Sequence, residues 1–509
     1  MLQKIYSAAV IGLSAEEVEI ETDISSGLPA TIVVGLPDAA IRESRERVKS
    51  ALKHANMQFP KSRVAVNLAP ADLPKIGSHY DLPIAISILL NSGQIQFEPK
   101  DKVFVGELAL DGALRSVPGV LVIAEAAAKR GFRTLFVPEA NAVEASLIKG
   151  LEVVRVKNLT SLLQMLAGIS PFTYFEKPET EKKEERPADN PWDFRLIRGQ
   201  ELAKRALEIA ASGGHNILMS GSPGSGKTLL ARALASILPT LTYQESLEVT
   251  KIYSVAGLLS AREGLQSLRP FRSPHHTASG IALVGGGSDP RPGEITLAHR
   301  GILFLDEFPE FGRYVLESLR QPLEDGFINV SRAARSVLFP AKFMLVAAQN
   351  PCPCGFAGDP EKACVCPPTQ LLRYQKKISG PLLDRIDLHV QVPRLSFEKI
   401  EGNEELENSD TVRGRVQAAR AIQQKRFARA GLAIQSNAEM GIKEIKEYCR
   451  PDEPGLMLLR NAVASQRLSA RAYHRVLKLA RTIADLSSVE KIRADHIAEA
   501  LMFRPKSES

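Results

Sequence analysis

Cysteine is scarce in this sequence, and long apolar runs are missing. Only five cysteines occur among 509 residues, and four of them lie between residues 352 and 366, which excludes the spread disulfide framework of a secreted protein. No stretch approaches the roughly 18 consecutive apolar residues that a membrane-spanning helix needs. The apolar residues 8–13 run directly into the acidic segment 16–21, so we expect a half-buried strand there and no signal peptide. These absences predict a protein of the reducing cytoplasm with no membrane partner.

Length and composition limit the number and kind of domains. A chain of 509 residues exceeds the roughly 250–300 residues that one hydrophobic core supports, so we expect two or three domains. With 44% hydrophobic and 24% charged residues, the composition is that of a globular protein and excludes a fibrous repeat. The net charge of +7 is compatible with a nucleic-acid partner, because lysine and arginine neutralise phosphates, but charge alone does not identify one.

Two changes in composition divide the chain. Nine of the twelve residues 176–187 are Glu, Lys or Arg and two are Pro, which leaves nothing apolar to bury and predicts a solvated linker. We place this linker at residues 171–192, after an amino-terminal domain at 1–170. Further on, an acidic, polar stretch gives way to a helical pattern, so we divide the remainder into a central domain at 193–400 and a helical domain at 401–509.

The three domains differ in how strands and helices alternate. Strand-like and helical runs mix in the first domain, which predicts an α+β fold. In the central domain short apolar strands alternate with helices, which is the pattern of an α/β core with a parallel sheet. Such a sheet carries ligands at the carboxyl ends of its strands. We therefore expect a multidomain protein with an α+β domain, an α/β core and an all-α domain.

A glycine-rich segment at residues 221–228 lies between an apolar strand and a helix of strong helix formers. In this context the backbone N–H groups of the loop close around phosphates at a helix amino terminus. Lys227 is expected to reach the β- and γ-phosphates, and Thr228 to offer its hydroxyl to Mg²⁺. The spacing predicts ATP binding by Gly221, Ser222, Pro223, Gly224, Ser225, Gly226, Lys227 and Thr228.

An acidic pair follows a second apolar strand, and it predicts that the chain hydrolyses the nucleotide as well as binding it. Residues 302–305 are apolar, and Asp306 and Glu307 follow them. Burial of this strand leaves Asp306 at its end to hold Mg²⁺ together with Thr228, and Glu307 to polarise the attacking water. We therefore predict a magnesium-dependent ATP hydrolase.

Three further side chains are suited to phosphoryl transfer. Asn350 follows a third apolar strand, at residues 343–348, where its amide is placed to sense the γ-phosphate and orient water. Arg385 and Arg471 each offer the guanidinium group that best matches charge developing on phosphoryl oxygens. A surface salt bridge is the alternative interpretation for both arginines.

Four of the cysteines form a tight cluster, Cys352, Cys354, Cys364 and Cys366. Four thiolates can ligate Zn²⁺ tetrahedrally. The C-x-C spacing is tighter than the usual C-x₂-C, so unligated or redox-active thiols remain the alternative. Because the cluster lies between Asn350 and Arg385 in the sequence, we expect a structural role, and loss of a metal to disturb a subunit interface without touching ATP directly.

The segments around residue 333 predict a hairpin. Residues 327–330 and 336–339 are strand-like, and they flank Arg332-Ala-Ala-Arg335. Arg332 and Arg335 are candidate contacts to nucleic-acid phosphates, with a simple solvated turn as the alternative. Before this region, the 77 residues between Thr228 and Asp306 exceed what one helix and one strand need, which predicts an insertion.

The ordered motifs resemble those of AAA+ ATPases of the magnesium-chelatase clade and, within it, of the ComM/YifB family. The likeness extends over nearly the whole chain. The likeness rests on five further motifs, which together are more specific than the phosphate loop. They lie at residues 271–279, 283–287, 292–295, 350–355 and 379–385.

This resemblance implies a role for each candidate residue and an assembly. Asn350 would be sensor 1, Arg385 the arginine finger that enters a neighbouring subunit's site, and Arg471 sensor 2 from a helical lid. A finger supplied by a neighbour requires a ring, and members of the family form homohexamers. The resemblance also implies that the insertion is a helix-2 insert and that the hairpin lines the ring pore.

The amino-terminal domain resembles the carboxyl-terminal domain of Lon-type proteases, at residues 73–77 and 106–112. His79 stands at the position of the nucleophilic serine, Ser78 lies one residue away, and the lysine position near residues 118–121 is apolar. We therefore expect a proteolytically inactive, Lon-like domain.

The family resemblance implies a DNA motor. It would be a hexameric branch-migration helicase that acts on single-stranded and branched DNA through its pore. Its role would be to promote recombination of incoming DNA during natural transformation, with recombination proteins as further partners.

Two other functions use the same ATPase. A magnesium-chelatase subunit would insert Mg²⁺ into a porphyrin, but a Lon-like domain is not part of that subunit's pattern. An ATP-dependent protease would need the missing dyad.

Overall fold

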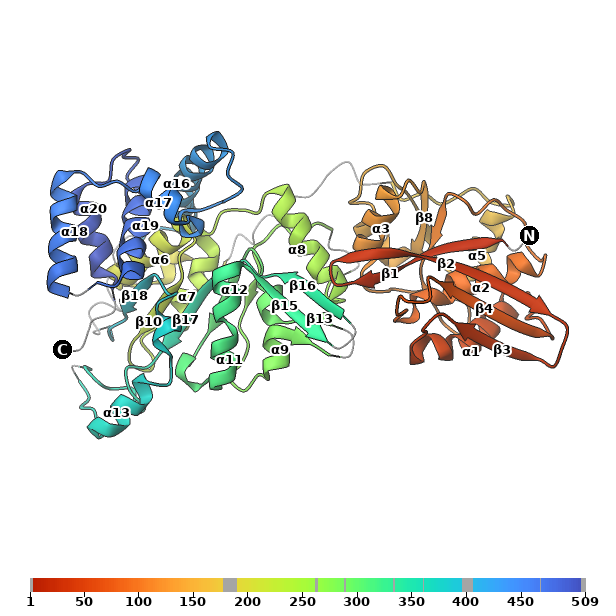
Figure 1. Ribbon diagram of the computed structural model, residues 1–509, viewed down its shortest axis with the longest axis horizontal. Coiled ribbons are helices and arrows are strands. Elements are labelled where there is room, and N and C mark those ends of the chain that lie inside the picture. Colours follow the sequence, from red (N-terminus) through yellow and green to blue (C-terminus); the bar gives the residue numbers. More distant parts are fainter. Residues whose placement is uncertain are drawn as a thin grey trace.

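The computed structural model describes residues 3–176, 190–260, 264–287, 290–332, 335–359, 361–395, 406–466 and 468–504. Figure 1 shows an elongated molecule with the amino-terminal sheet at one end, a second sheet in the middle and the carboxyl-terminal helices at the other end. Within the described part of the chain, no helix has both the length and the apolar character needed to cross a bilayer.

A seven-stranded mixed sheet organises the amino-terminal part, in the order β3-β4-β2-β1-β5-β8-β9. In β2, Val18 and Ile20 are fully buried and alternate with glutamates, and Ile20 lies opposite Ile5 of β1, as the half-buried strand predicted there requires. Residues 173–175, inside the predicted linker, hydrogen-bond along β9. The strands are β1 (Lys4–Ile11), β2 (Ser14–Ser25), β3 (Ala30–Val34), β4 (Arg63–Ala69), β5 (Lys102–Phe104), β8 (Thr134–Pro138) and β9 (Glu152–Val156).

Helices cover this sheet, and α2 is the most deeply buried of them. Its carboxylate Asp81 is fully buried and forms an ion pair with Arg47 at 2.6 Å, because a buried charge requires a partner. The longer helices are α1 (Ala39–His54), α2 (Asp81–Asn91), α3 (Val120–Lys129) and α5 (Leu159–Leu166), with the short α4 (Ala142–Ala145) after β8.

The central region contains a five-stranded parallel sheet in the order β11-β14-β17-β10-β18. The predicted α/β core with a parallel sheet is therefore confirmed. Its strands are short and mostly apolar, as is usual in parallel sheets whose two faces are covered. They are β10 (Ile217–Ser220), β11 (Phe271–Arg272), β14 (Ile302–Leu305), β17 (Met344–Gln349) and β18 (Leu388–Gln391).

Additional elements interrupt this core between β10 and β17. After α7 (Lys227–Ile237), the chain forms α8 (Tyr243–Val255) and the short α9 (Gly280–Val284) before it reaches β14. After β14 come α11 (Arg313–Ser318) and α12 (Arg320–Asp325), and then an antiparallel hairpin of β15 (Phe327–Arg332) and β16 (Arg335–Pro340). The hairpin therefore forms where alternating strand-like residues flank residues 332–335.

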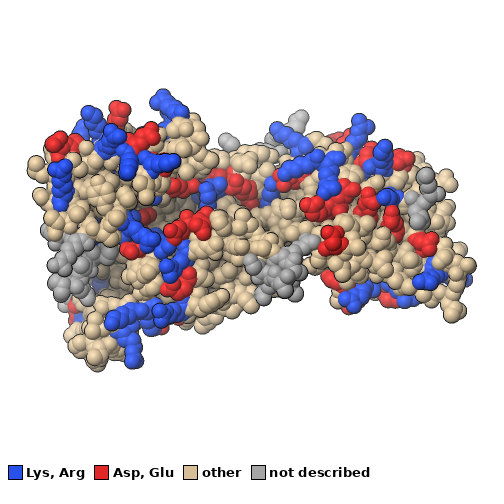
Figure 2. All heavy atoms as spheres, viewed as in Figure 1, with Lys and Arg blue, Asp and Glu red and all other residues tan. Residues whose placement is uncertain are grey.

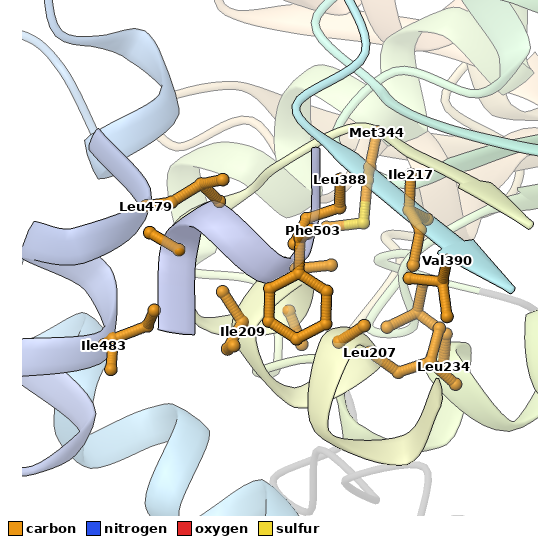
Figure 3. Packing of buried hydrophobic residues seen from close by; sticks show 14 of the residues in the cluster. Leu207, Ile209, Ile217, Leu234, Met344, Leu388, Val390, Leu479, Ile483 and Phe503 are labelled. Carbon is orange, nitrogen blue, oxygen red and sulfur yellow. The ribbon is translucent and has the colours of Figure 1, made fainter. Parts of the chain in front are cut away.

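The described residues from 406 to 504 form helices and their connections. These helices share one hydrophobic cluster with the central sheet and with α6 (Glu201–Gly213). Figure 3 shows Phe503 among residues of α6, β18 and α19. The helices are α16 (Ser409–Arg429), α17 (Ile442–Tyr448), α18 (Glu453–Gln466), α19 (Ala470–Leu486) and α20 (Ala494–Met502).

The amino-terminal part docks on α8 and on the hairpin of the central region (Figure 1). Glu144 accepts hydrogen bonds from the Ser254 hydroxyl at 2.6 Å and from Asn141 at 2.6 Å, and burial raises the pKa of this carboxyl. Lys251 of α8 binds Glu125 of α3 at 2.8 Å. The buried Glu144–Ser254 bond and the partly buried Glu125–Lys251 pair join the two parts across their interface.

Candidate active site

The glycine-rich loop lies between β10 and α7, as the sequence predicts. Gly224 and Gly226 have φ values of 78° and 89°, which residues with a Cβ rarely adopt. This backbone turns the loop so that α7 begins at Lys227. The amino terminus of an 11-residue helix, with its unpaired N–H groups and positive dipole end, therefore faces the loop. The loop is built to hold an anion.

The Lys227 side chain is folded back into the loop. Its Nζ donates hydrogen bonds to the carbonyl oxygens of Gly221 at 2.7 Å and Ser222 at 3.0 Å, and to Asn350 Oδ1 at 3.3 Å. Burial lowers the pKa of this ammonium, and the negative charge of Asp306 partly offsets that effect. Phosphate oxygens can take over these contacts, because they are stronger acceptors for an ammonium than carbonyl or amide oxygens.

The carboxyl ends of three strands meet around this lysine. Asp306 follows β14, and its Oδ2 accepts a hydrogen bond from the Thr228 hydroxyl at 2.9 Å. Asn350 follows β17, the strand between β14 and β10. A hydroxyl and a carboxylate in contact beside a phosphate loop provide the oxygen ligands that Mg²⁺ prefers. Thr228 and Asp306 therefore fit a magnesium ion.

Glu307 adopts a strained backbone and has a partner that the sequence did not indicate. Its φ is 51°, a value that is uncommon for a residue with a side chain and that often marks a functional site. Its Oε2 lies 2.9 Å from His276 Nδ1. The residues lie far apart in the sequence, so no spacing rule connects them. The contact holds the carboxylate next to the metal-binding position.

Arg385 and Arg471 lie together, away from the phosphate loop. Both line a cavity of about 750 Å³ between the core and the helical region. Arg385 donates to Pro381 O at 2.6 Å and to the Glu324 carboxylate, and it lowers the pKa of Glu324. Among the described residues that line this cavity, none belongs to residues 221–228. Within one chain, these arginines and the phosphate loop therefore belong to different surfaces.

Comparison with known families assigns the whole chain. The family described as "Magnesium chelatase, subunit ChlI" matches residues 193–400, "Subunit ChlI of Mg-chelatase" matches 20–141, and "Magnesium chelatase, subunit ChlI C-terminal" matches 406–504. The chain is 44% identical to "Competence protein ComM" of Haemophilus influenzae, over 98% of this chain and 97% of that protein. It is 42% identical to "Uncharacterized protein YifB" of Escherichia coli, over 99% and 97%. The chain belongs to the ComM/YifB family.

Membership of the ComM/YifB family confirms the resemblance drawn from the motifs. The family is built on the magnesium-chelatase type of AAA+ ATPase, which implies ATP and Mg²⁺ at the site described above. A more distant relative is "Magnesium-chelatase 38 kDa subunit" of Cereibacter sphaeroides, which is 27% identical over 32% of this chain and 53% of that protein.

The four clustered cysteines of this ComM/YifB chain meet in space as free thiols. Cys352 Sγ lies 3.3 Å from Cys354 Sγ and 3.7 Å from Cys364 Sγ, and all four sulfurs, including that of Cys366, lie within 4.8 Å of one another. A tetrahedral zinc site, with Zn–S bonds of about 2.3 Å, separates its sulfurs by about 3.8 Å. Backbone hydrogen bonds from Phe356 and Val365 lower the pKa of the Cys354 thiol to about 6. The cluster therefore fits a thiolate-bound metal ion.

The loop that carries the cysteines contacts the phosphate loop, a contact that the expected role at a subunit interface does not include. Asp359, in the loop between the cysteine pairs, accepts a hydrogen bond from the Ser222 hydroxyl of the phosphate loop at 2.5 Å. Sequence position suggested an interface role because the cluster lies between Asn350 and Arg385. The chain instead folds back after β17, and this brings the cysteine loop onto the nucleotide-binding loop.

The hairpin arginines are paired along the backbone. Arg332 of β15 lies opposite Arg335 of β16, at the end of the hairpin where the chain passes from one strand to the other. Their side chains fall outside the described residues, so the predicted phosphate contacts stay a prediction. At the other end of the hairpin, Phe339 is buried in a cluster against which Ile11 and Leu13 of the amino-terminal sheet also pack.

Proposed function

We propose that this chain is an ATP-driven, ring-shaped DNA motor. In this proposal a homohexameric branch-migration helicase promotes recombination of incoming DNA during natural transformation. The observation that carries it is the match over almost the full length to a protein named for competence. The separation of Arg385 from the phosphate loop supports the ring, because an arginine finger for that loop would then come from a neighbouring chain.

A basic cavity supports a polyanionic partner. Arg313, Arg373, Lys376 and Lys377 line a cavity of about 700 Å³ between α11 and α13 (Pro368–Gln375). All four are exposed, and Figure 2 shows basic side chains grouped around the end of the molecule where α13 lies. Lys377 is partly neutralised by Glu310 at 2.7 Å. The remaining charge suits the evenly spaced phosphates of a nucleic-acid strand.

The magnesium-chelatase alternative is supported by less of the chain. The chelatase relative shares 27% identity over 32% of this chain, whereas the competence protein matches 98% of it. Both activities would use an ATPase domain of the same type, so similarity within the ATPase domain does not distinguish them. The competence protein matches the amino-terminal region as well as the ATPase core, and this full-length match favours the DNA motor.

The geometry around His79 supports an inactive, Lon-like amino-terminal domain. His79 is buried, its Nε2 lies 2.9 Å from Ala8 O, and burial lowers its pKa to about 4. The Ser78 hydroxyl donates to the Glu107 carboxylate, and the buried Lys75 contacts Pro70 O. The Ser78 hydroxyl is therefore bound to a carboxylate, whereas a serine–lysine peptidase needs its serine beside a lysine base.

The proposed motor is tested by strand displacement. The purified chain is incubated with ATP and fluorescently labelled three- and four-stranded DNA junctions, alongside a Lys227→Ala control. We expect ATP-dependent strand separation and faster ATP hydrolysis when DNA is added. If neither activity appears with any junction, the DNA-motor proposal is wrong. Magnesium insertion into protoporphyrin in the same preparation would favour the chelatase.

The basic cavity gives a prediction for DNA affinity. In the double variant Arg373→Ala/Lys376→Ala, two phosphate contacts are lost, so the slope of log K against log salt for single-stranded DNA should become shallower by about 1.4. Fluorescence anisotropy at several salt concentrations measures this slope. Lys49→Ala/Lys53→Ala on the exposed face of α1 removes the same charge elsewhere and should leave the slope unchanged. Equal slopes for both variants would refute a cavity-specific contact.

We further propose that the four cysteines hold one zinc ion. The expected result is about one zinc per chain by elemental analysis of protein purified under reducing conditions. Cys354→Ser and Cys364→Ser should each lower the zinc content severalfold, because each removes one of four ligands. Cys449→Ser, at a cysteine far from the cluster, should leave it unchanged. Metal-free wild-type protein would contradict the zinc proposal.

A further inference from the structure

The loop that carries the four cysteines supports the tip of the phosphate loop at two points. Asp359 Oδ2 accepts the Ser222 hydroxyl at 2.5 Å. Gly355, with a φ of 87°, lies directly against Pro223, and a Cβ added there would come within 2.6 Å of Pro223 Cδ. The two contacts fall on consecutive residues of the phosphate loop, so the cysteine loop packs against the segment that must fold around phosphates.

Asp359 also accepts hydrogen bonds within the cysteine loop itself. Its Oδ1 accepts the backbone N–H groups of Glu361 and Lys362, both at 3.0 Å. One carboxylate oxygen is therefore anchored within the cysteine loop, and the other binds the phosphate loop. Asn350 forms a second connection between the cysteine loop and the phosphate loop. It accepts a hydrogen bond from Lys227 Nζ at 3.3 Å, and it precedes Cys352 by two positions.

We propose that Asp359 is a positioning residue that couples metal occupancy of the four-cysteine loop to nucleotide affinity at the phosphate loop. The inference rests on the nucleotide and zinc binding proposed above. The four cysteines form no disulfide, so a metal bound by all four sulfurs would tie the two ends of the cysteine loop together. Without the metal the loop spreads, and Asp359 and Gly355 withdraw from Ser222 and Pro223. The phosphate loop then loses the support that keeps its N–H groups aimed at phosphate.

Coupling of this kind is reciprocal, which makes it measurable from both sides. A fluorescent ADP analogue is titrated into the full-length chain loaded with Zn²⁺, stripped with 1,10-phenanthroline under reducing conditions, and reloaded. We expect stripping to weaken nucleotide affinity about 10-fold and reloading to restore it. Bound nucleotide should slow metal loss to the chelator by a similar factor.

Variants at Asp359 separate coupling from simple support. Asp359→Ala should weaken nucleotide binding about 10-fold in the metal-loaded protein and abolish its dependence on the metal. Asp359→Asn keeps an acceptor for Ser222 and should restore part of the dependence. Glu361→Ala removes an exposed carboxylate of the same loop, which pairs with Arg394 at 3.2 Å, and should behave as wild type. The absorption spectrum of the Co²⁺-loaded protein should be the same in all variants, because none of them alters a ligand.

The outcomes distinguish this inference from the proposals beneath it. If metal-loaded wild type does not bind the nucleotide, the ATPase assignment fails. If wild type takes up neither Zn²⁺ nor Co²⁺, the metal proposal fails and the coupling with it. If it binds both ligands independently, or if Asp359→Ala keeps the full metal dependence of nucleotide affinity, the coupling through Asp359 is wrong.

Discussion

Replacing Lys227 with alanine is expected to reduce ATP hydrolysis by at least about 100-fold. The Nζ of Lys227 already contacts two phosphate-loop carbonyl oxygens and Asn350, so it lies where the β- and γ-phosphates arrive. No other lysine or arginine occurs in residues 221–228 to replace its charge. Nucleotide affinity should fall with hydrolysis. Steady-state ATPase assays and titration with a fluorescent ADP analogue measure both effects.

Protein stability serves as the control for the Lys227 variant. Among the described residues Lys227 forms no salt bridge, so the midpoint of thermal unfolding without nucleotide should change little. ATP should raise that midpoint in the wild type but not in the variant, because only a ligand that binds the native state stabilises it. Lys129→Ala, at an exposed lysine of α3, should keep full activity. Wild-type hydrolysis by Lys227→Ala would mean that the loop is not the catalytic site.

Local patterns predicted the elements that carry the nucleotide site. The phosphate loop, the strand before Asp306 and the strand before Asn350 are each fixed by a short apolar run and the polar residues after it. Such runs become buried strands of a parallel sheet, whose carboxyl ends meet at one edge. The meeting of Thr228, Asp306 and Asn350 therefore follows from topology, and topology could be inferred from the alternation of strands and helices.

Contacts between distant segments could not be inferred in this way. His276 reaches Glu307, and Asp359 reaches Ser222, through loops whose path depends on packing and on no sequence period. Likewise, the docking of α3 on α8 depends on buried groups such as Glu144 and Ser254, which each look like ordinary surface residues in the sequence. Motif matching assigns roles to single residues, but it does not predict which residues of one motif contact those of another.

Mixed rings of two inactive chains are expected to recover ATP hydrolysis. Arg385→Ala alone should lower the turnover number about 10³-fold, because an arginine finger stabilises charge on the transferring phosphoryl group. Lys227→Ala inactivates the phosphate loop of its own chain but leaves Arg385 available to the site of the neighbouring chain. In a random one-to-one ring, about a quarter of the sites pair an intact phosphate loop with an intact finger. Co-expression with two affinity tags and sequential purification isolates such rings for ATPase assays.

The geometry around Arg385 makes this test interpretable. Its partner Glu324 has a side chain that is 58% exposed, so loss of Arg385 leaves no buried, unpaired charge and should not unfold the chain. Rings that mix Lys227→Ala with Glu307→Gln are the matched control. Both changes damage the same half of the site, so these rings should stay inactive.

If rings that contain Lys227→Ala and Arg385→Ala are no more active than this control, Arg385 does not complete a neighbour's site. If Arg385→Ala alone keeps wild-type turnover, Arg385 is not a finger and is limited to its contact with Glu324.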